Sequence, residues 1–231
     1  MIAKTTLRLA ALGCISLTSA FGSIILSVQG DPIETGGPIV YAGNSVVASF
    51  TSSQAWTNVD ISVTLGGPPG IFDGTAFLTD AIGPGVTTAN ESAGAAFQAD
   101  LRVFPFQGSF TVLQGLSLSP GTYYLTLSST MADFNTSFNW EEAAHHTQIT
   151  TAPGTTLGSY FESLGNSQAA YAPGSSYSTW QFSPLEFTVT GQPAPEPPSG
   201  WLMLSAAAIA GLLALLRRPP IPSESSHCQS R

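Results

Sequence analysis

The sequence predicts an all-β fold: an antiparallel two-sheet β-sandwich, jelly-roll-like, that spans residues 23–191 as one ectodomain. Short segments rich in Val, Thr, Phe, Tyr and Ile alternate apolar with polar residues, and clusters of Gly, Pro, Asn and Ser separate them. The sequence shows no long amphipathic pattern and no repeat of roughly 20–50 residues, which argues against helical bundles, solenoids and propellers. Two sheets packed through their apolar faces satisfy these observations most simply.

The clearest strand is Thr57–Leu65, because every second residue in it is aliphatic. The same alternation predicts strands at Thr122–Ser129, directly after a turn-forming Pro-Gly pair, and at Pro184–Thr190. Shorter alternating runs predict further strands at Ser45–Thr51, Thr75–Ile82, Ala95–Phe104, Ser109–Val112 and Ser178–Phe182. About eight or nine strands result, and Glu141–Thr147 is compatible with two helical turns.

Residues 1–22 predict a secretory signal peptide. Two cations precede the mostly apolar run Leu9–Phe21, and small residues suited to cleavage end at Ala20 or Gly22. A hydrophobic N-terminal strand is one alternative, and a lipoprotein signal that uses Cys14 is another.

Charge and cysteine content narrow the possible partners. Only 9% of the residues are charged, and 14 acids stand against 6 bases. Arg102 is the only Lys or Arg between residues 9 and 216, so the chain lacks the clustered cations that a nucleic-acid partner requires. Both cysteines, Cys14 and Cys228, lie outside the predicted domain, which therefore has no disulfide and depends on its apolar core.

One transmembrane helix is predicted over residues 201–218. Trp201 begins an uncharged apolar run that ends before Arg217 and Arg218. As a helix this run rises about 24 Å, with Trp201 at one interface and the arginines on the cytoplasmic side. Residues 219–231 are rich in Ser and Pro and predict a disordered cytoplasmic tail.

A Pro-rich linker over residues 192–200 precedes this helix and holds the motif Pro195, Glu196 and Pro197. The order of motif, helix and arginine pair resembles the PEP-CTERM sorting signal of Gram-negative bacteria, although this chain continues past the arginines. The resemblance implies processing by an exosortase, a membrane-bound sorting enzyme, in species that secrete polysaccharide and form biofilms. The protein is then expected in the inner membrane before processing, and at the cell surface or in the extracellular matrix afterwards.

Aromatic side chains predict a ligand-binding platform, because the C–H faces of sugar rings pack on π-systems. The candidates are Trp56, Tyr124, Trp140 and Trp180, each with core packing as the alternative. Calcium is the one cofactor that the acids favour, since Ca²⁺ prefers carboxylate and loop carbonyl oxygens. The acids in or beside Gly/Pro-rich loops are Asp31, Glu34, Asp73 and Asp80, although no ligand set is assigned among them.

The sequence shows no recognisable catalytic motif. No Gly-x-Ser-x-Gly elbow occurs, and nothing singles out two acids as a glycosidase pair. The segment from Glu141 to His146 pairs acids with histidines at helical spacing, a metal-binding pattern without an identifiable third ligand. The sequence therefore predicts an exported structural or adhesive surface protein that is not an enzyme. The alternative is a calcium-assisted jelly-roll module that binds extracellular polysaccharide.

Overall fold

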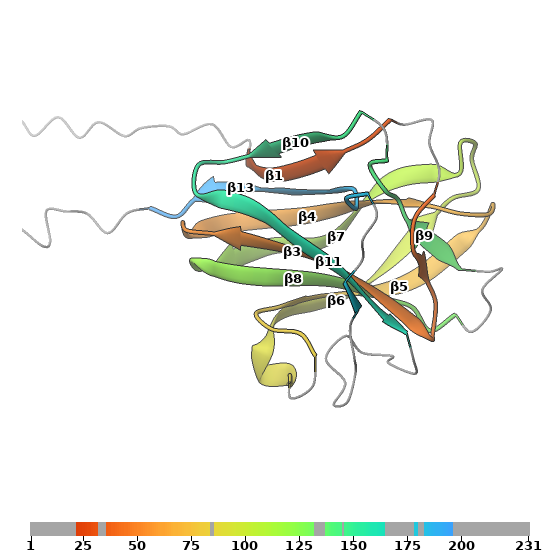
Figure 1. The fold of residues 1–231 in the computed structure, drawn as a ribbon, viewed down its shortest axis with the longest axis horizontal. Helices are drawn as coiled ribbons and strands as arrows, with labels where there is room; N and C mark the ends of the chain where they lie inside the picture. Colours follow the sequence, from red (N-terminus) through yellow and green to blue (C-terminus); the bar gives the residue numbers. More distant parts are fainter. Residues whose placement is uncertain are drawn as a thin grey trace, which may run out of the picture. The chain divides into compact units, whose positions relative to one another are not determined.

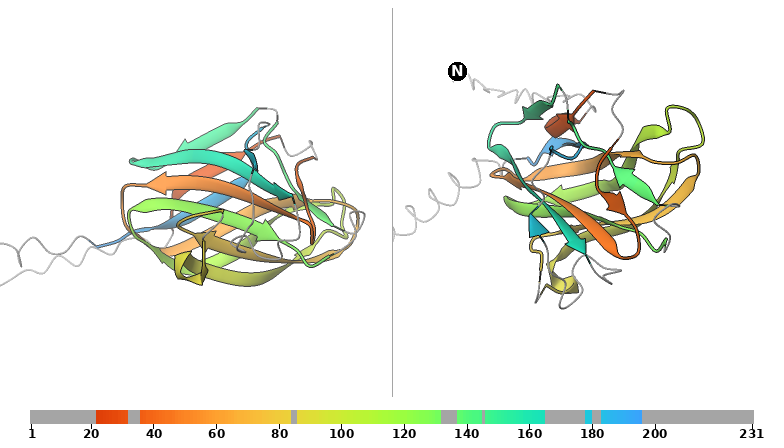
Figure 2. Two further views of the ribbon diagram at one scale, coloured as in Figure 1. Left: turned by 60° about the horizontal axis from the view of Figure 1, so that its bottom comes forward. Right: turned by 45° about the vertical axis from the view of Figure 1, so that its right-hand side comes forward.

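The computed structural model describes residues 22–31, 36–83, 86–131, 137–144, 146–164, 178–179 and 183–195. These residues form an all-β sandwich of two antiparallel sheets, as the sequence predicts (Figures 1 and 2). Residues 1–21 of the predicted signal peptide, most of the Pro-rich linker, the predicted membrane helix and the tail lie outside the described residues. Within the described ranges, no helix is long and apolar enough to cross a membrane.

The larger sheet has seven strands in the order β10-β1-β13-β4-β9-β2, and β7 also pairs with β4. Its strands are β1 (Ser23–Gln29), β2 (Ile39–Val40), β4 (Trp56–Gly66), β7 (Gln107–Leu118), β9 (Phe138–Trp140), β10 (Gln148–Thr151) and β13 (Phe187–Pro193). The six-stranded sheet has the order β12-β11-β3-β8-β5-β6. Its strands are β3 (Asn44–Ser52), β5 (Ile71–Thr79), β6 (Glu91–Asp100), β8 (Gly121–Ser128), β11 (Thr155–Leu164) and β12 (Ser178–Thr179).

Apolar side chains on the facing sides of the two sheets form the core. On β4 the alternate residues Val59, Ile61, Val63 and Leu65 are all 0% exposed. Aromatic contacts join the sheets, among them two that involve β3 and β5. The ring of Phe50 on β3 lies 6.3 Å from that of Phe187 on β13, and the ring of Phe72 on β5 lies 6.4 Å from that of Phe138 on β9. Burial of this apolar surface is the main stabilising contribution in a domain without disulfides.

The first and last strands of the sandwich are neighbours. β13 lies between β1 and β4 (Figure 1). Ser23 of β1 pairs with Gly191 of β13. The N-terminal end of β1 and the C-terminal end of β13 therefore lie side by side. The last strand is an interior strand of its sheet, so most of its backbone groups have partners on both sides.

The strands that the sequence predicts most strongly are confirmed. Thr57–Leu65 corresponds to β4, Thr122–Ser129 to β8, and Pro184–Thr190 overlaps β13. The strand predicted over Ala95–Phe104 ends at Asp100. The helical interpretation of Glu141–Thr147 is wrong: the described residues of this segment are not helical, and its first residues extend the pairing of β9, with Glu142 in a β-bridge with Leu185.

Replacement of a β4 core residue tests this packing. Ile61→Ala is expected to lower the free energy of unfolding by about 2–5 kcal/mol, because it leaves a cavity between the sheets. Ile149 on β10 is 50% exposed and provides the matched control, for which Ile149→Ala should cost no more than about 0.5 kcal/mol. Urea unfolding followed by tryptophan fluorescence measures both, and equal losses would contradict the placement of Ile61 in the core.

Candidate functional site

The predicted aromatic platform is wrong for two of its four members. Trp56 is 3% exposed and its Nε1–H donates to Ser52 Oγ at 2.9 Å. Trp140 is 0% exposed and its Nε1–H donates to the Glu186 carbonyl oxygen at 2.8 Å. Both indoles pack in the core, where each N–H finds a buried acceptor and no ring face is open to a ligand.

Of the other two members, the structure describes only Tyr124. Tyr124 is half-buried on the outer face of β8, and its ring lies 6.2 Å from that of Phe161 on β11. Trp180 lies outside the described residues. Of the predicted sorting and anchor residues, Pro195 is described and exposed, whereas Glu196, Pro197, Trp201, Arg217 and Arg218 lie outside the described residues.

The acids considered for calcium are not brought together. Asp80 accepts a hydrogen bond from Asn90, Asp73 accepts one from Gln98, and Asp31 lies 3.8 Å from His146 Nδ1. Glu34 is outside the described residues. In the part of the chain that the structure describes, no three His, Cys, Asp or Glu side chains are grouped as metal ligands would be.

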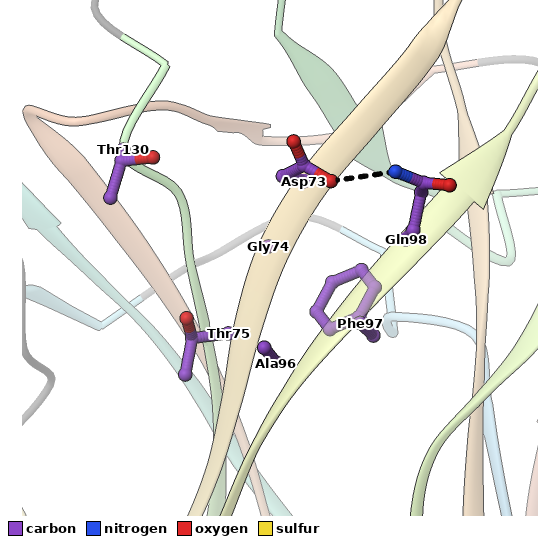
Figure 3. A pocket seen from close by; sticks show the side chains of 7 residues that line it. All are labelled: Asp73, Gly74, Thr75, Ala96, Phe97, Gln98 and Thr130. Atoms are coloured by element: carbon purple, nitrogen blue, oxygen red, sulfur yellow. Dashed lines mark hydrogen bonds between the residues drawn. The ribbon is translucent and has the colours of Figure 1, made fainter.

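A hollow lies on the outer face of each sheet. The first, of about 450 Å³, is on the six-stranded sheet (Figure 3). It is lined by Asp73, Gly74, Thr75, Ala96, Phe97, Gln98 and Thr130. Asp73 Oδ1 accepts a hydrogen bond of 3.0 Å from Gln98 Nε2, so the carboxylate is already paired across β5 and β6. The Phe97 ring turns to the core, where it lies 5.8 Å from that of Phe138.

The second hollow, of about 400 Å³, is on the seven-stranded sheet, and we call it the Glu186 groove. β1, β13, β4 and β7 all contribute to it, and Pro105 from the β6–β7 loop lines one side. Its lining is rich in hydroxyl and amide side chains: Gln29, Ser62, Thr64, Gln107, Ser109 and Thr188. Glu186, which precedes β13, is the only charged residue among the described residues that line it.

The Glu186 carboxylate is held in a fixed position. Its Oε1 accepts a 2.9 Å hydrogen bond from the Gly30 backbone N–H, and the Thr64 side chain also hydrogen-bonds the carboxylate. A Cβ at Gly30 would lie 2.7 Å from Glu186 Oε1, so glycine is needed for this close approach. Burial raises the pKa of Glu186, while these two hydrogen bonds act in the opposite direction.

A second glutamate, Glu141, lies beside this position and is completely buried. Its Oε2 accepts a 2.6 Å hydrogen bond from the Gly36 N–H, whereas Oε1 has no partner among the described residues. Oε1 occupies the space over Gly66, where a Cβ would be 1.7 Å away. Burial raises the pKa of Glu141 to about 7, and the negative charges of Glu186 and Glu142 add to the rise.

The two glutamates do not have the arrangement of a glycosidase pair. Such a pair needs two carboxyl groups that both reach the scissile bond. Glu141 is 0% exposed, and its carboxyl lies against Gly36 and Gly66. Of the two, only Glu186 lines the groove, so the geometry gives a polar surface with one anchored acceptor.

The loop between β6 and β7 carries exposed apolar residues that the sequence interpretation overlooked. Val103 and Phe104 are each 79% exposed, next to the groove residue Pro105. The Phe106 N–H donates to the Val103 carbonyl oxygen, and the Gly67 N–H donates to that of Phe106, which ties this loop to the sheet. Pro105 is the sequence signal that the strand predicted over Ala95–Phe104 ends early and that a loop follows it.

No protein-family model matches this chain, and no curated protein matches it either. The functional interpretation therefore depends on the sequence, the groove and the ends of the domain.

The buried carboxyl of Glu141 predicts a pH-dependent stability. Its pKa is 4.5 in the unfolded chain and about 7 in the domain, so the folded state prefers the protonated form. Stability is then highest below pH 4.5 and falls as pH rises toward 7, by about 3 kcal/mol from this group. Glu141→Gln removes this dependence because the amide does not ionise.

Urea unfolding of both proteins between pH 4 and pH 8 measures this effect. The wild type and Glu141→Gln should be similarly stable at pH 4, and the variant should become the more stable one toward pH 8. Parallel stability curves across this range would show that Glu141 ionises in the fold as freely as in the unfolded chain.

Proposed function

We propose that this chain is an exported, non-catalytic protein of the cell surface or extracellular matrix, with a structural or adhesive role. In this proposal a signal peptide exports it, the C-terminal helix anchors it in the inner membrane, and an exosortase processes it at the PEP-CTERM motif. The match between the limits of the sandwich and the predicted processing sites supports this most directly. β1 begins at Ser23, next to the predicted signal peptide, and β13 ends at Pro193, two residues before Pro195.

This match means that processing removes no strand residue. Cleavage after Ala20 or Gly22 leaves Ser23 to pair with Gly191. Cleavage at or after Pro195 leaves all of β13 between β1 and β4. The mature protein therefore keeps its complete core, and the strands at its two ends remain paired with each other.

Carbohydrate binding by a jelly-roll-like module is the second candidate. Two-sheet jelly rolls include lectin domains. The Glu186 groove favours this function, because hydroxyl, amide and carboxylate groups gather there on one face of a sheet. Calcium assistance has less support, since a single acid lines the groove among the described residues.

Mass spectrometry of the protein from its native host tests the sorting proposal. In the presence of the sorting enzyme, the mature chain should begin at or before Ser23, end near Pro195–Pro197, and reach the surface or matrix. Glu196→Ala should block this processing, whereas Glu224→Ala, an acid outside the motif, should leave it unchanged. A full-length C-terminus that does not respond to loss of the enzyme would show that the helix is a plain membrane anchor.

A further inference from the structure

We propose that the Glu186 groove binds a segment of a neutral glycan, without a metal ion, and that Phe104 contributes an apolar contact at its rim. This deepens the adhesive role proposed above and depends on that role for its biological setting. The lining chemistry, the anchored carboxylate, the exposed aromatic loop and the strand pairing beneath the groove each support it independently.

The lining matches the hydrogen-bonding character of sugars. Serine and threonine hydroxyls and glutamine amides both donate and accept hydrogen bonds, as sugar hydroxyls do. Six such side chains come from four different strands and share one face of the sheet, so the polar surface is continuous across β1, β13, β4 and β7. The volume of about 400 Å³ is within the range of small-ligand sites.

Glu186 provides the orienting contact. Gly30 and Thr64 already hydrogen-bond the carboxylate, which fixes its direction before a ligand arrives. A carboxylate has about four lone-pair sites, so acceptor capacity remains for a hydroxyl group in the groove. A hydrogen bond to an ionised acceptor is stronger than one between neutral groups. The groove therefore has one strong acceptor among weaker groups that both donate and accept.

Charge selects against anionic ligands. None of the described residues that line the groove is basic, and Glu186 gives it a negative charge. An anionic polysaccharide would meet a carboxylate without any compensating cation, and like charges repel. A neutral glycan has no such cost.

The β6–β7 loop adds the apolar contact that sugar rings also need. Phe104 exposes 79% of its surface, and the loop's hydrogen bonds to Gly67 and within itself hold the segment in place. The Phe104 ring also makes an edge contact with Phe106, with the ring centroids 5.7 Å apart. An exposed aromatic face beside a polar groove suits a ligand with apolar C–H faces and polar edges.

Strand pairing beneath the groove argues against a peptide ligand. An extended peptide usually binds by adding a strand to a free sheet edge. β1, β13 and β4 each have strand partners on both sides, so along most of the groove floor the backbone groups are already used. β7 also lines the groove and pairs only with β4 among the described strands, so a peptide is disfavoured over the part of the floor that β1, β13 and β4 form. Over that part, binding comes from side chains, which fits a glycan.

Binding of defined polysaccharides to the full chain in mild detergent tests the proposal. The neutral probes are laminarin, dextran and galactomannan, and alginate is the anionic probe, all in the presence of EDTA. Affinity electrophoresis and calorimetry should show binding of at least one neutral probe and none of alginate. Failure of all three neutral probes, binding of alginate, or a requirement for calcium would overturn the proposal. Binding of an extended peptide, with no binding of any glycan, would identify a peptide as the partner and would also overturn the proposal.

Variants locate the site. Ser109→Trp fills the groove and should abolish binding, while Ser117→Trp, at another exposed position of β7, should bind as the wild type does. Glu186→Gln should weaken binding about tenfold, as expected for loss of a hydrogen bond to a charged group. Phe104→Ala should weaken it severalfold with unchanged thermal unfolding, because its side chain is exposed. Equal binding by Ser109→Trp and Ser117→Trp would place the site elsewhere.

The binding experiment and the processing experiment have independent outcomes. Binding is measured on the purified chain without the sorting enzyme, so a host that does not process the protein leaves the binding result unaffected. An absence of binding leaves the positions of the mature ends unaffected in the same way.

Discussion

Strict alternation along β4 from Val59 to Leu65 is the constraint on which both the core and the groove depend. Its inward residues from Val59 to Leu65 are completely buried between the sheets. Because a pleated strand sends successive side chains to opposite faces, the same strand places Ser62 and Thr64 in the groove and leaves Gly66 open for the Glu141 carboxyl. A shift of one residue in register would exchange the two faces. Apolar burial thus determines where the polar groups of the groove stand.

The end of β4 is also where the sheet changes partners. The Thr64 N–H donates to the Glu186 carbonyl oxygen, and the Glu141 N–H donates to that of Thr64. β13 pairs with β4 before this point and β9 pairs with it after, so two glutamates from distant parts of the chain become neighbours. Their carboxyls are buried at a cost in free energy, because only some of their oxygens gain hydrogen bonds. The hydrogen bonds that the Glu186 carboxylate does form fix its position at the groove.

The sequence could predict the strands with regular alternation, and it could not predict the groove. β4 and β8 show one apolar face, whereas β1 continues the apolar run of the predicted signal peptide and β11 lacks regular alternation. The helix expected from Glu141 onward does not form, because tertiary pairing with β4 overrides local propensity. Alternation alone could not place Trp140, whose position depends on the acceptor that Glu186 provides. The groove collects residues from four strands, and their proximity follows from strand order, which the sequence left open.

Native-state hydrogen exchange of the full chain tests most directly whether the strands at the two ends of the domain belong to its cooperative core. Amides of β1 and β13 that pair across Val28 and Phe187 should exchange with the same free energy as those at the centre of β4. Equal free energies would mean that the sandwich unfolds as one cooperative unit, which includes the paired strands that form the groove. Exchange of β1 and β13 through local opening, several kcal/mol below the value for β4, would contradict the account.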